Sequence, residues 1–199
     1  TQRGTFYHLK MGEFNIGEKQ YLNSLLPING DDEIKSATIL SKDTESSNIL
    51  FLTKNGILKK SALSEYNLRR NTGVQALKLD DGDLIASILI LKDERVGILT
   101  KEGNFIIIET KDIRPIGRVV GIKLNEGDKV VSGRVIPKET REILSVSEDG
   151  YSKRTDINEF KITGRATKGV KIQRADNLCD FLPLIDLSDI LVVSSTTQI

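Results

Sequence analysis

Cysteine, histidine and aromatic residues are scarce in this sequence, and each scarcity excludes a class of site. The 199 residues include one cysteine, Cys179, and one histidine, His8. A disulfide framework, a multi-cysteine zinc site, a two-histidine metal site and a histidine proton relay are therefore all excluded. Aromatic residues make up only 5% of the chain and do not interleave with its basic pairs, which disfavours stacking on single-stranded bases.

Long hydrophobic runs are also lacking. Runs such as Phe105–Ile108 and Ile190–Val193 are far shorter than the roughly 20 apolar residues that span a bilayer. No charged-then-apolar leader opens the sequence, so we expect a cytoplasmic protein with no membrane partner. The sequence begins at Thr1 and has its single methionine at Met11, which suggests a piece of a longer polypeptide.

What is present is enough apolar material for a core and a nearly balanced charge. Hydrophobic residues make up 38% of the chain and charged residues 29%, which fits one domain of ordinary size or two small ones. The formal net charge is +1, so the chain is no disordered polyelectrolyte. The total charge alone does not indicate nucleic-acid binding.

The sequence repeats itself four times. Polar segments that end in glycine recur at residues 1–4, 53–56, 100–103 and 147–150, so their glycines are spaced by 52, 47 and 47 residues. An acid and a large apolar residue follow each glycine at fixed distances, and these pairs are Glu13-Phe14, Glu65-Tyr66, Asp112-Ile113 and Glu159-Phe160. Further anchors are the Gly-Val or Gly-Ile pairs at Gly73, Gly121 and Gly169, and the Gly-Asp turns at Gly82 and Gly127 with a looser one at Gly30. We therefore expect a single domain of four units, roughly 1–47, 48–94, 95–140 and 141–199.

Each unit predicts four β-strands. An apolar strand (48–52, 96–99 or 143–146) leads into a polar-Gly turn, and Asn55-Gly56 and Asp149-Gly150 favour the two-residue type I′ hairpin. Three more strands are expected in each unit, at 57–61, 73–79 and 84–91 in the second unit and at 104–109, 121–124 and 129–136 in the third. Four strands in about 48 residues are typical of a propeller blade. The predicted fold is all-β, a propeller-like array of about four four-stranded blades.

The last residues leave the closure of this array open. Residues 189–195 resemble a leading strand but no turn follows them. Either this strand pairs with the first unit and closes a ring, which would remove exposed edges, or both ends belong to a longer array.

Basic residues are concentrated in three of the four units. Residues 151–174 contain seven basic and two acidic side chains, residues 54–78 six and one, and residues 101–123 five and three. Lys59-Lys60 and Lys153-Arg154 occupy the same place, third and fourth after the turn glycine. Equivalent positions on successive blades lie at the same height, so these residues and those before each Gly-Val strand are expected to line an outer rim.

The predicted rim has a defined membership and two interruptions. The first and third units carry Tyr7-His8 and Ile106-Ile107 where the other units carry basic pairs. A basic rim suits the phosphate backbone of duplex DNA, which is recognised by charge and by bending rather than by base edges. The competing interpretation, a solvated surface of mixed charge, is disfavoured by the repetition in register. The predicted DNA contacts are Lys59, Lys60, Arg69, Arg70, Arg114, Arg118, Lys153, Arg154, Arg165, Lys168 and Lys171.

Three other motifs have structural interpretations that we favour over catalytic ones. Tyr66 aligns with large apolar residues in the other units, so it is expected in the core rather than at a catalytic centre. The Gly164–Gly169 segment is not followed by Lys-Ser/Thr, which disfavours a nucleotide-binding loop. The Asp80–Asp83 cluster lacks a twelve-residue calcium loop with a terminal Glu, so it is expected to form a turn. We predict no catalytic residue, metal or cofactor in this chain.

Several segments together resemble the C-terminal domain of the A subunit of bacterial DNA gyrase. They are Ser24–Ile28, Asn55–Lys60, Gly117–Val131, Asp149–Thr155 and Arg165–Val170, in the same order along nearly the whole chain. The resemblance implies a β-pinwheel, which is a propeller-like fold with swapped strand order, that wraps duplex DNA around its basic perimeter. It also implies a non-catalytic part of an ATP-dependent enzyme that introduces negative supercoils. The implied partners are the rest of the gyrase A subunit, together with the gyrase B subunit.

The chain departs from that family in two ways that leave alternatives open. The hallmark box Gln-Arg-Arg-Gly-Gly-Lys-Gly is absent, which puts chiral wrapping in question, and four units are fewer than gyrase A usually has. The tails of topoisomerase IV A subunits, with fewer blades and weaker wrapping, are a related possibility. A different class of function, a propeller-like protein-interaction scaffold, would show salt-insensitive binding to a protein and no affinity for DNA.

Overall fold

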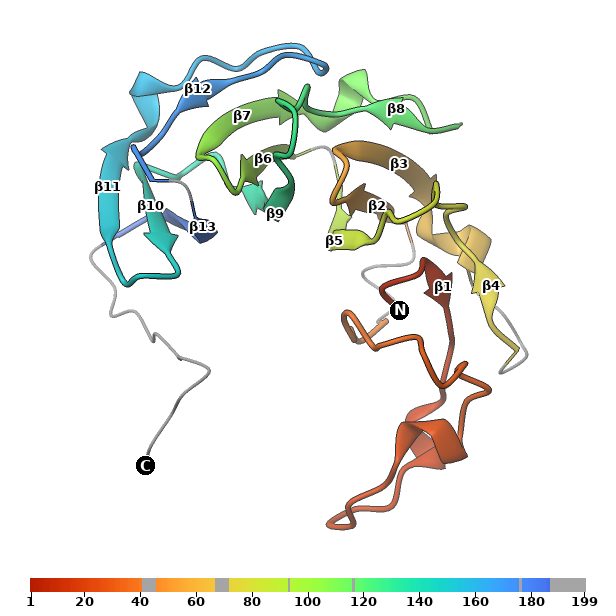
Figure 1. Cartoon of the computed structure of the whole chain (residues 1–199). Coiled ribbons are helices and arrows are strands. Elements are labelled where there is room, and N and C mark those ends of the chain that lie inside the picture. Colours follow the sequence, from red (N-terminus) through yellow and green to blue (C-terminus); the bar gives the residue numbers. More distant parts are fainter. Residues whose placement is uncertain (41–45, 67–71, 93, 116, 176, 187–199) are drawn as a thin grey trace.

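The computed structural model describes residues 1–40, 46–66, 72–92, 94–115, 117–175 and 177–186. Within these residues the fold is all-β, and four antiparallel sheets follow one another around an open arc (Figure 1). The predicted class, a propeller-like β-pinwheel, is confirmed. Helical structure is limited to single 3-10 turns, and none of the described helices could cross a membrane.

The four sheets, here called blades one to four in chain order, differ in completeness. Blade one pairs β1 (Thr5–Phe6) with β4 (Val74–Gln75). Blade two has the order β5 (Ile85–Leu91), β2 (Asn48–Thr53), β3 (Ile57–Ala62), β8 (Val119–Val120). Blade three has the order β9 (Val130–Ile136), β6 (Arg95–Thr100), β7 (Asn104–Glu109), β12 (Val170–Lys171). Blade four has the order β13 (Leu178–Leu184), β10 (Glu142–Ser147), β11 (Ser152–Asp156). The 3-10 turns are η1 (Met11–Glu13), η2 (Leu22–Ser24), η4 (Leu63–Tyr66), η5 (Thr110–Asp112) and η6 (Ile157–Glu159).

The short Gly-Val strand of each unit is exchanged onto the preceding blade. β4, β8 and β12 belong to the second, third and fourth units, yet they pair in blades one, two and three. β4 and β8 are shorter than predicted, and β8 ends before Gly121 rather than beginning there. The segment after each exchanged strand stays docked, because the amides of Ala76, Gly121 and Ile172 donate to the carbonyl oxygens of Gly4, Gly56 and Gly103.

The hairpin turns differ from the predicted type I′. A type I′ turn needs positive φ at both of its central residues. In these turns only the glycines, Gly56, Gly103 and Gly150, have positive φ. The amide of each glycine donates to the carbonyl oxygen three residues earlier, for example Gly56 to Thr53 at 3.0 Å. The longer hairpin loop, in which an ordinary turn is followed by a left-handed glycine, is therefore used in all three blades.

The first unit forms less regular structure than the repeat predicted. Its described residues contribute only β1 to a sheet, and the rest of 7–40 contains the single turns η1 and η2. Large apolar side chains are exposed there, including Met11, Ile16 and Tyr21. The possible closing strand at 189–195 lies outside the described residues.

The core lies between the blades, in three clusters that pack neighbouring sheets face to face. Tyr66 packs with Phe51 and Leu63 beside blade two, Leu50 and Ile98 pack between blades two and three, and a third cluster includes Phe105, Ile143 and Phe181. Both faces of the central strands are covered, which is why β2 and β6 are continuous apolar runs rather than alternating ones. The predicted core role of Tyr66 is confirmed, since it is 3% exposed.

The Gly-Asp turns connect one unit to the next hairpin by a repeated contact. The carboxylate of Asp83 accepts a hydrogen bond from the amide of Asn55 (3.0 Å), and that of Asp128 accepts one from the amide of Glu102 (3.1 Å). Asn55 and Glu102 each stand directly before a turn glycine. Asp32 does the same for Arg3 at 3.2 Å. The acidic cluster therefore forms a turn, as predicted, and its looser first-unit counterpart belongs to the same series.

An ion pair joins the inner strands of blades three and four. Arg134 on β9 and Asp180 on β13 form a bidentate pair, and Ser132 Oγ donates to Asp180 at 2.6 Å. Burial alone would raise the pKa of Asp180, but the hydrogen bonds from Arg134 and Ser132 outweigh it and hold the pKa below its usual value.

The pair predicts a pH-dependent contribution to stability. A depressed pKa stabilises the folded state above the unfolded pKa and ceases to do so as the pH falls through the folded pKa. Asp180→Asn is therefore expected to lower the free energy of unfolding at neutral pH, and by much less at about pH 3. Urea unfolding at both pH values measures this, with exposed Asp81→Asn as control. A loss of stability that is the same at both pH values would refute the assignment.

Candidate nucleic-acid interface

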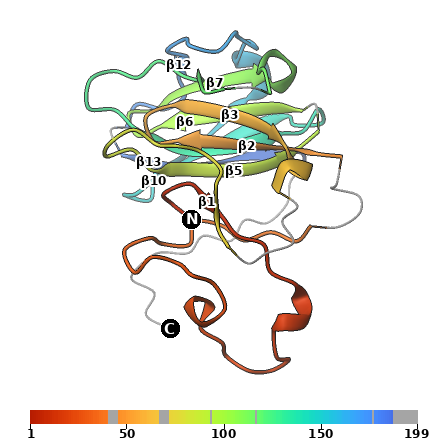
Figure 2. The ribbon, with the colours of Figure 1, turned by 90° about the vertical axis from the view of Figure 1, so that its right-hand side faces the viewer.

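The exchanged strands form the outer edge of the arc. In Figure 1, β4, β8 and β12 lie on its convex side, whereas β5, β9 and β13 line the inner side. Figure 2 shows β12 beyond β7 at one side of the stacked strands. We call the residues of the exchanged strands and their flanking loops the outer edge: 72–78, 111–115, 117–123 and 161–171.

The outer edge carries five of the predicted contact residues, and all five are exposed. They are Arg114, Arg118, Arg165, Lys168 and Lys171. Four of them lie in the loops that lead into the exchanged strands β8 and β12, and Lys171 lies on β12 itself, so strand exchange determines where these charges lie. The structure thus brings together basic residues that belong to two different units.

Several of these basic side chains contact the preceding unit. Arg118 donates to the carbonyl oxygen of Lys78 at 2.8 Å and pairs with Asp80 at 2.9 Å. Lys168 Nζ donates to Asn125 Oδ1 at 2.8 Å, and Lys171 Nζ donates to the carbonyl oxygen of Glu102. Each contact ties a cation to the blade next to it, so the charges have defined positions along the edge.

The loop before β12 is fixed by backbone contacts. The amide of Ala166 donates to Gly121 O at 2.7 Å, and the amide of Lys123 donates to Thr167 O at 2.9 Å. Ala166 has φ +63°, a conformation that a residue with a Cβ rarely adopts. The surrounding hydrogen bonds therefore hold this loop, with Arg165 and Lys168, against the third unit.

The two predicted basic pairs are divided between the faces of their strands. Lys59 on β3 donates to Ala76 O, and Lys153 on β11 donates to Ile172 O at 3.1 Å, so these two residues have equivalent partners. Lys60 points the opposite way, as alternation along a strand requires. It is 6% exposed and donates to Thr110 O at 2.8 Å, so the expectation that it lines an exposed rim is wrong.

Arg154 differs from its repeat equivalent Lys60 because β11 is the outermost described strand of blade four. Its guanidinium donates to Glu142 Oε2 at 2.8 Å and remains about half exposed. The remaining predicted pair, Arg69 and Arg70, lies outside the described residues.

Sequence reasoning missed four exposed lysines of the outer edge: Lys78, Lys111, Lys123 and Lys161. Lys123 and Lys78 lie in the segments that follow β8 and β4, whereas the predicted Arg114 and Arg118 precede β8. Lys123 stands two residues after Gly121, as Lys171 stands two residues after Gly169. The repeat register was the signal that could have identified Lys123.

The third unit interrupts the basic series, as predicted. Ile106 and Ile107 are both 2% exposed, and β12 covers the strand that carries them. Positive charge on this blade therefore comes from the exchanged strand and its loop rather than from β7. Among the described residues, no group of three or more His, Cys, Asp or Glu side chains could hold a metal ion.

These features define a class: a β-pinwheel domain whose exchanged strands present exposed basic side chains along the outer edge. The sequence matches the family described as DNA gyrase C-terminal domain, beta-propeller, over residues 47–92, 98–137 and 141–178. The chain belongs to this family.

Curated relatives cover most or all of the chain. It is 32% identical over 214 residues to the DNA gyrase A protein of Helicobacter pylori (strain ATCC 700392 / 26695), with 100% of this chain and 26% of that protein covered. It is 35% identical over 179 residues to the DNA gyrase A protein of Escherichia coli (strain K12), with 85% of this chain and 20% of that protein covered. The chain thus spans about a quarter or less of the length of these relatives.

Solved structures agree on the fold. The DNA gyrase A C-terminal domain superposes with a TM-score of 0.75 at 28% identity, covering 92% of this chain and 63% of that one. The C-terminal domain of DNA topoisomerase IV superposes with a TM-score of 0.83 at 23% identity, covering 92% of this chain and 61% of that one. The higher structural score of the topoisomerase IV domain reflects fold alone at that identity.

Proposed function

We propose that this chain binds duplex DNA without sequence preference and bends it along the outer edge. The observation that carries the proposal is the series of exposed cations on the exchanged strands and their loops, from Lys78 through Lys123 to Lys171. Their backbone follows a convex curve over successive blades (Figure 1). A polyanion that follows this curve would meet positive charge repeatedly and would be bent by doing so.

The contacts within the protein leave these cations able to bind phosphate. An ammonium group has three donors, and Lys168 and Lys171 each use one in the hydrogen bonds described. The remaining donors are free to reach phosphate oxygens, which carry no sequence information. The paucity of exposed aromatic side chains along the edge supports duplex rather than single-stranded DNA as the ligand.

As part of a gyrase A protein, the domain would present bent DNA to the remainder of that protein, and also to its gyrase B partner. Its contribution would be to ATP-dependent negative supercoiling by the whole enzyme, while the chain itself performs no chemistry. The proposal carries a cytoplasmic location with it, because bacterial chromosomal DNA lies there.

Salt and DNA length test this proposal together. If about 6 phosphates are neutralised, affinity for linear duplex is expected to fall about 10³-fold between roughly 50 and 200 mM salt. Since smooth bending of a short site costs on the order of 1–6 kcal/mol, a duplex of about 100 base pairs should bind more tightly than one of about 20. Filter binding measures both effects.

Each result has an outcome that counts against the proposal. Equal affinity for the short and long duplexes would refute the proposed bending of the DNA. If neither duplex binds at low salt, the proposal of DNA binding is refuted, and the alternative of a protein-interaction scaffold is favoured.

A further inference from the structure

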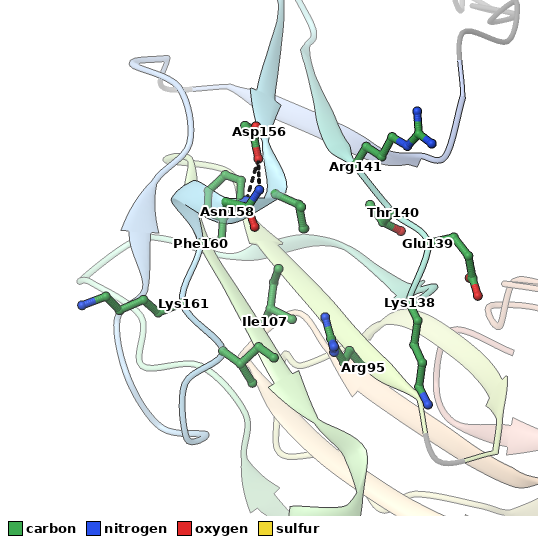
Figure 3. Close-up of a pocket in the computed structure, with 12 residues that line it drawn as sticks. Arg95, Ile107, Lys138, Glu139, Thr140, Arg141, Asp156, Asn158, Phe160 and Lys161 are labelled. Carbon is green, nitrogen blue, oxygen red and sulfur yellow. Dashed lines mark hydrogen bonds between the residues drawn. The ribbon is translucent and has the colours of Figure 1, made fainter.

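The cations of the outer edge differ in what holds them, and Arg118 is the one that faces a carboxylate. Among the outer-edge cations in the described part of the chain, Arg118 alone forms an ion pair, with Asp80 at 2.9 Å. Both side chains remain in contact with solvent, 41% of Arg118 and 60% of Asp80 being exposed. Lys161 illustrates the other cations: its side chain points away from Asp156, whose carboxylate accepts hydrogen bonds from Asn158 (Figure 3). The contact with an acid is therefore particular to the loop that carries Arg118.

Asp80 occupies a position that recurs in the repeat. It opens the Gly-Asp turn of the second unit, and Asn29 and Asn125 open those of the first and third units. In each turn the backbone carbonyl oxygen of this residue accepts the amide three residues later, at 2.9 Å for Asn29, 3.0 Å for Asp80 and 3.2 Å for Asn125. We call it the turn-opening residue. The turn itself is formed equally with aspartate and with asparagine at this position.

The turn-opening residue accepts a cation from the loop that leads into the exchanged strand. Arg118 Nη1 donates to Asp80 Oδ1, and Lys168 Nζ donates to Asn125 Oδ1 at 2.8 Å in the next unit. The neutral amide oxygen of Asn125 thus holds its cation without a charge. Arg118 has a second, neutral acceptor, because Nη1 also donates to the carbonyl oxygen of Lys78 at 2.8 Å. The negative charge of Asp80 is therefore not needed to position Arg118.

The acid nearest to Lys168 is one side chain further away. Asn125 Nδ2 donates to Glu102 Oε2 at 2.8 Å, so the amide stands between Lys168 and this carboxylate. In the second unit the residue in the place of Glu102 is the neutral Asn55. The second and third units thus carry one acid and one amide in opposite order. Because the attraction between charges falls with distance, the charge of the cation is offset more strongly at Asp80 than at Asn125.

We propose that Asp80 lowers the affinity of the outer edge for DNA at blade two, because it competes with a phosphate group for Arg118. This inference rests on the proposed binding of duplex DNA. A phosphate that approaches Arg118 must displace the carboxylate or meet its repulsion, whereas one that approaches Lys168 meets an amide. The loop of Arg118 leads into β8 on blade two, and the loop of Lys168 leads into β12 on blade three. DNA is therefore held more weakly at blade two than at blade three.

Filter binding of linear duplex by Asp80→Asn, with the neighbouring Asp81→Asn as control, tests the proposal. Both variants remove one negative charge from the same turn, and both side chains are exposed. At roughly 50 mM salt, Asp80→Asn is expected to bind about fivefold more tightly than the unaltered chain and Asp81→Asn less than about twofold. The dependence of log affinity on log salt should become steeper by about 1 in Asp80→Asn alone, because Arg118 becomes a full phosphate contact. Asparagine opens the same turn in two other units, so the variant is expected to fold.

A second background identifies the cation on which Asp80 acts. In Arg118→Gln, the further change Asp80→Asn should have no larger effect than Asp81→Asn, because the competition has lost its object. Equal gains from the two acids in the unaltered chain, or an undiminished gain from Asp80→Asn without Arg118, would show an effect of total charge and refute the inference alone. Weaker binding by Asp80→Asn would refute it too, since Asp80 would then position Arg118 for DNA. If the unaltered chain binds no duplex, the proposed function fails and this inference fails with it.

Discussion

Lys168→Glu/Lys171→Glu is expected to reduce affinity for linear duplex DNA about 100-fold at low salt. Both side chains lie on the outer edge and have ammonium donors left for phosphate, so reversal removes two contacts and adds repulsion. The loss should be equal for unrelated DNA sequences, because phosphate contacts carry no base information. The dependence of log affinity on log salt should become shallower by about 2. Filter binding over a salt series measures both quantities.

A matched pair of substitutions tests whether position or net charge matters. Lys19→Glu/Lys35→Glu changes the net charge by the same amount at two lysines that lie outside the outer edge, in a segment that contributes no exchanged strand. This control should bind DNA nearly as the unaltered chain does. If the two double variants lose affinity equally, the outer edge has no special role and the effect is one of total charge.

Gly169→Ala is expected to have the largest effect on stability. Gly169 precedes β12 with φ +75°, and a Cβ there would overlap Ile106 Cγ2 and the carbonyl oxygen of Phe105. The left-handed conformation and the overlap together should cost about 3–4 kcal/mol. Because β12 pairs only through Val170 and Lys171, the strand should detach from β7 and the amide of Ile172 should lose its protection from hydrogen exchange.

Gly150→Ala provides the control for this substitution. Gly150 has a similar φ of +84°, but no heavy atom lies within 4 Å of the position that a Cβ would take. Only the conformational cost of about 1–2 kcal/mol should appear, with no change in the exchange of Ile172. Urea unfolding and hydrogen exchange compare the two variants. Equal destabilisation by the two variants would mean that contact with blade three does not restrict the size of the side chain at position 169.

The repeat made most strands predictable, because their signals are local. Turn glycines, apolar runs and Gly-Asp turns can each be recognised from a few consecutive residues. The observed bounds therefore differ by a residue or two at most from the predicted ranges for β2, β3, β6, β7 and β9. The type I′ turns were wrong for an equally local reason. Asn-Gly is compatible with two kinds of hairpin loop, and the choice depends on how the strands end around it.

The pairing partners of strands could not be read from residue order. Nothing in the composition of Val119–Val120 says that it pairs with β3 rather than with a strand of its own unit, since the backbone hydrogen bonds are alike. The burial of Lys60 has the same origin. Its carbonyl partner, Thr110, belongs to the next unit, so burial emerges only when blades two and three are placed together. For the outer edge, sequence identified the loops before β8 and β12, but it missed the lysines in the segments that follow β4 and β8.

Strand exchange also bears on how such arrays can change length during evolution. Blades one to three bind the exchanged strand in the same way: the carbonyl oxygen of a turn glycine accepts a hydrogen bond from an amide of the next unit. If one whole 47-residue period is deleted or duplicated between matching points, each remaining turn glycine is still followed by a unit with an equivalent strand to pair with its blade. Units can thus be gained or lost as modules, whereas a single unit taken alone would lack the strand that its own successor supplies.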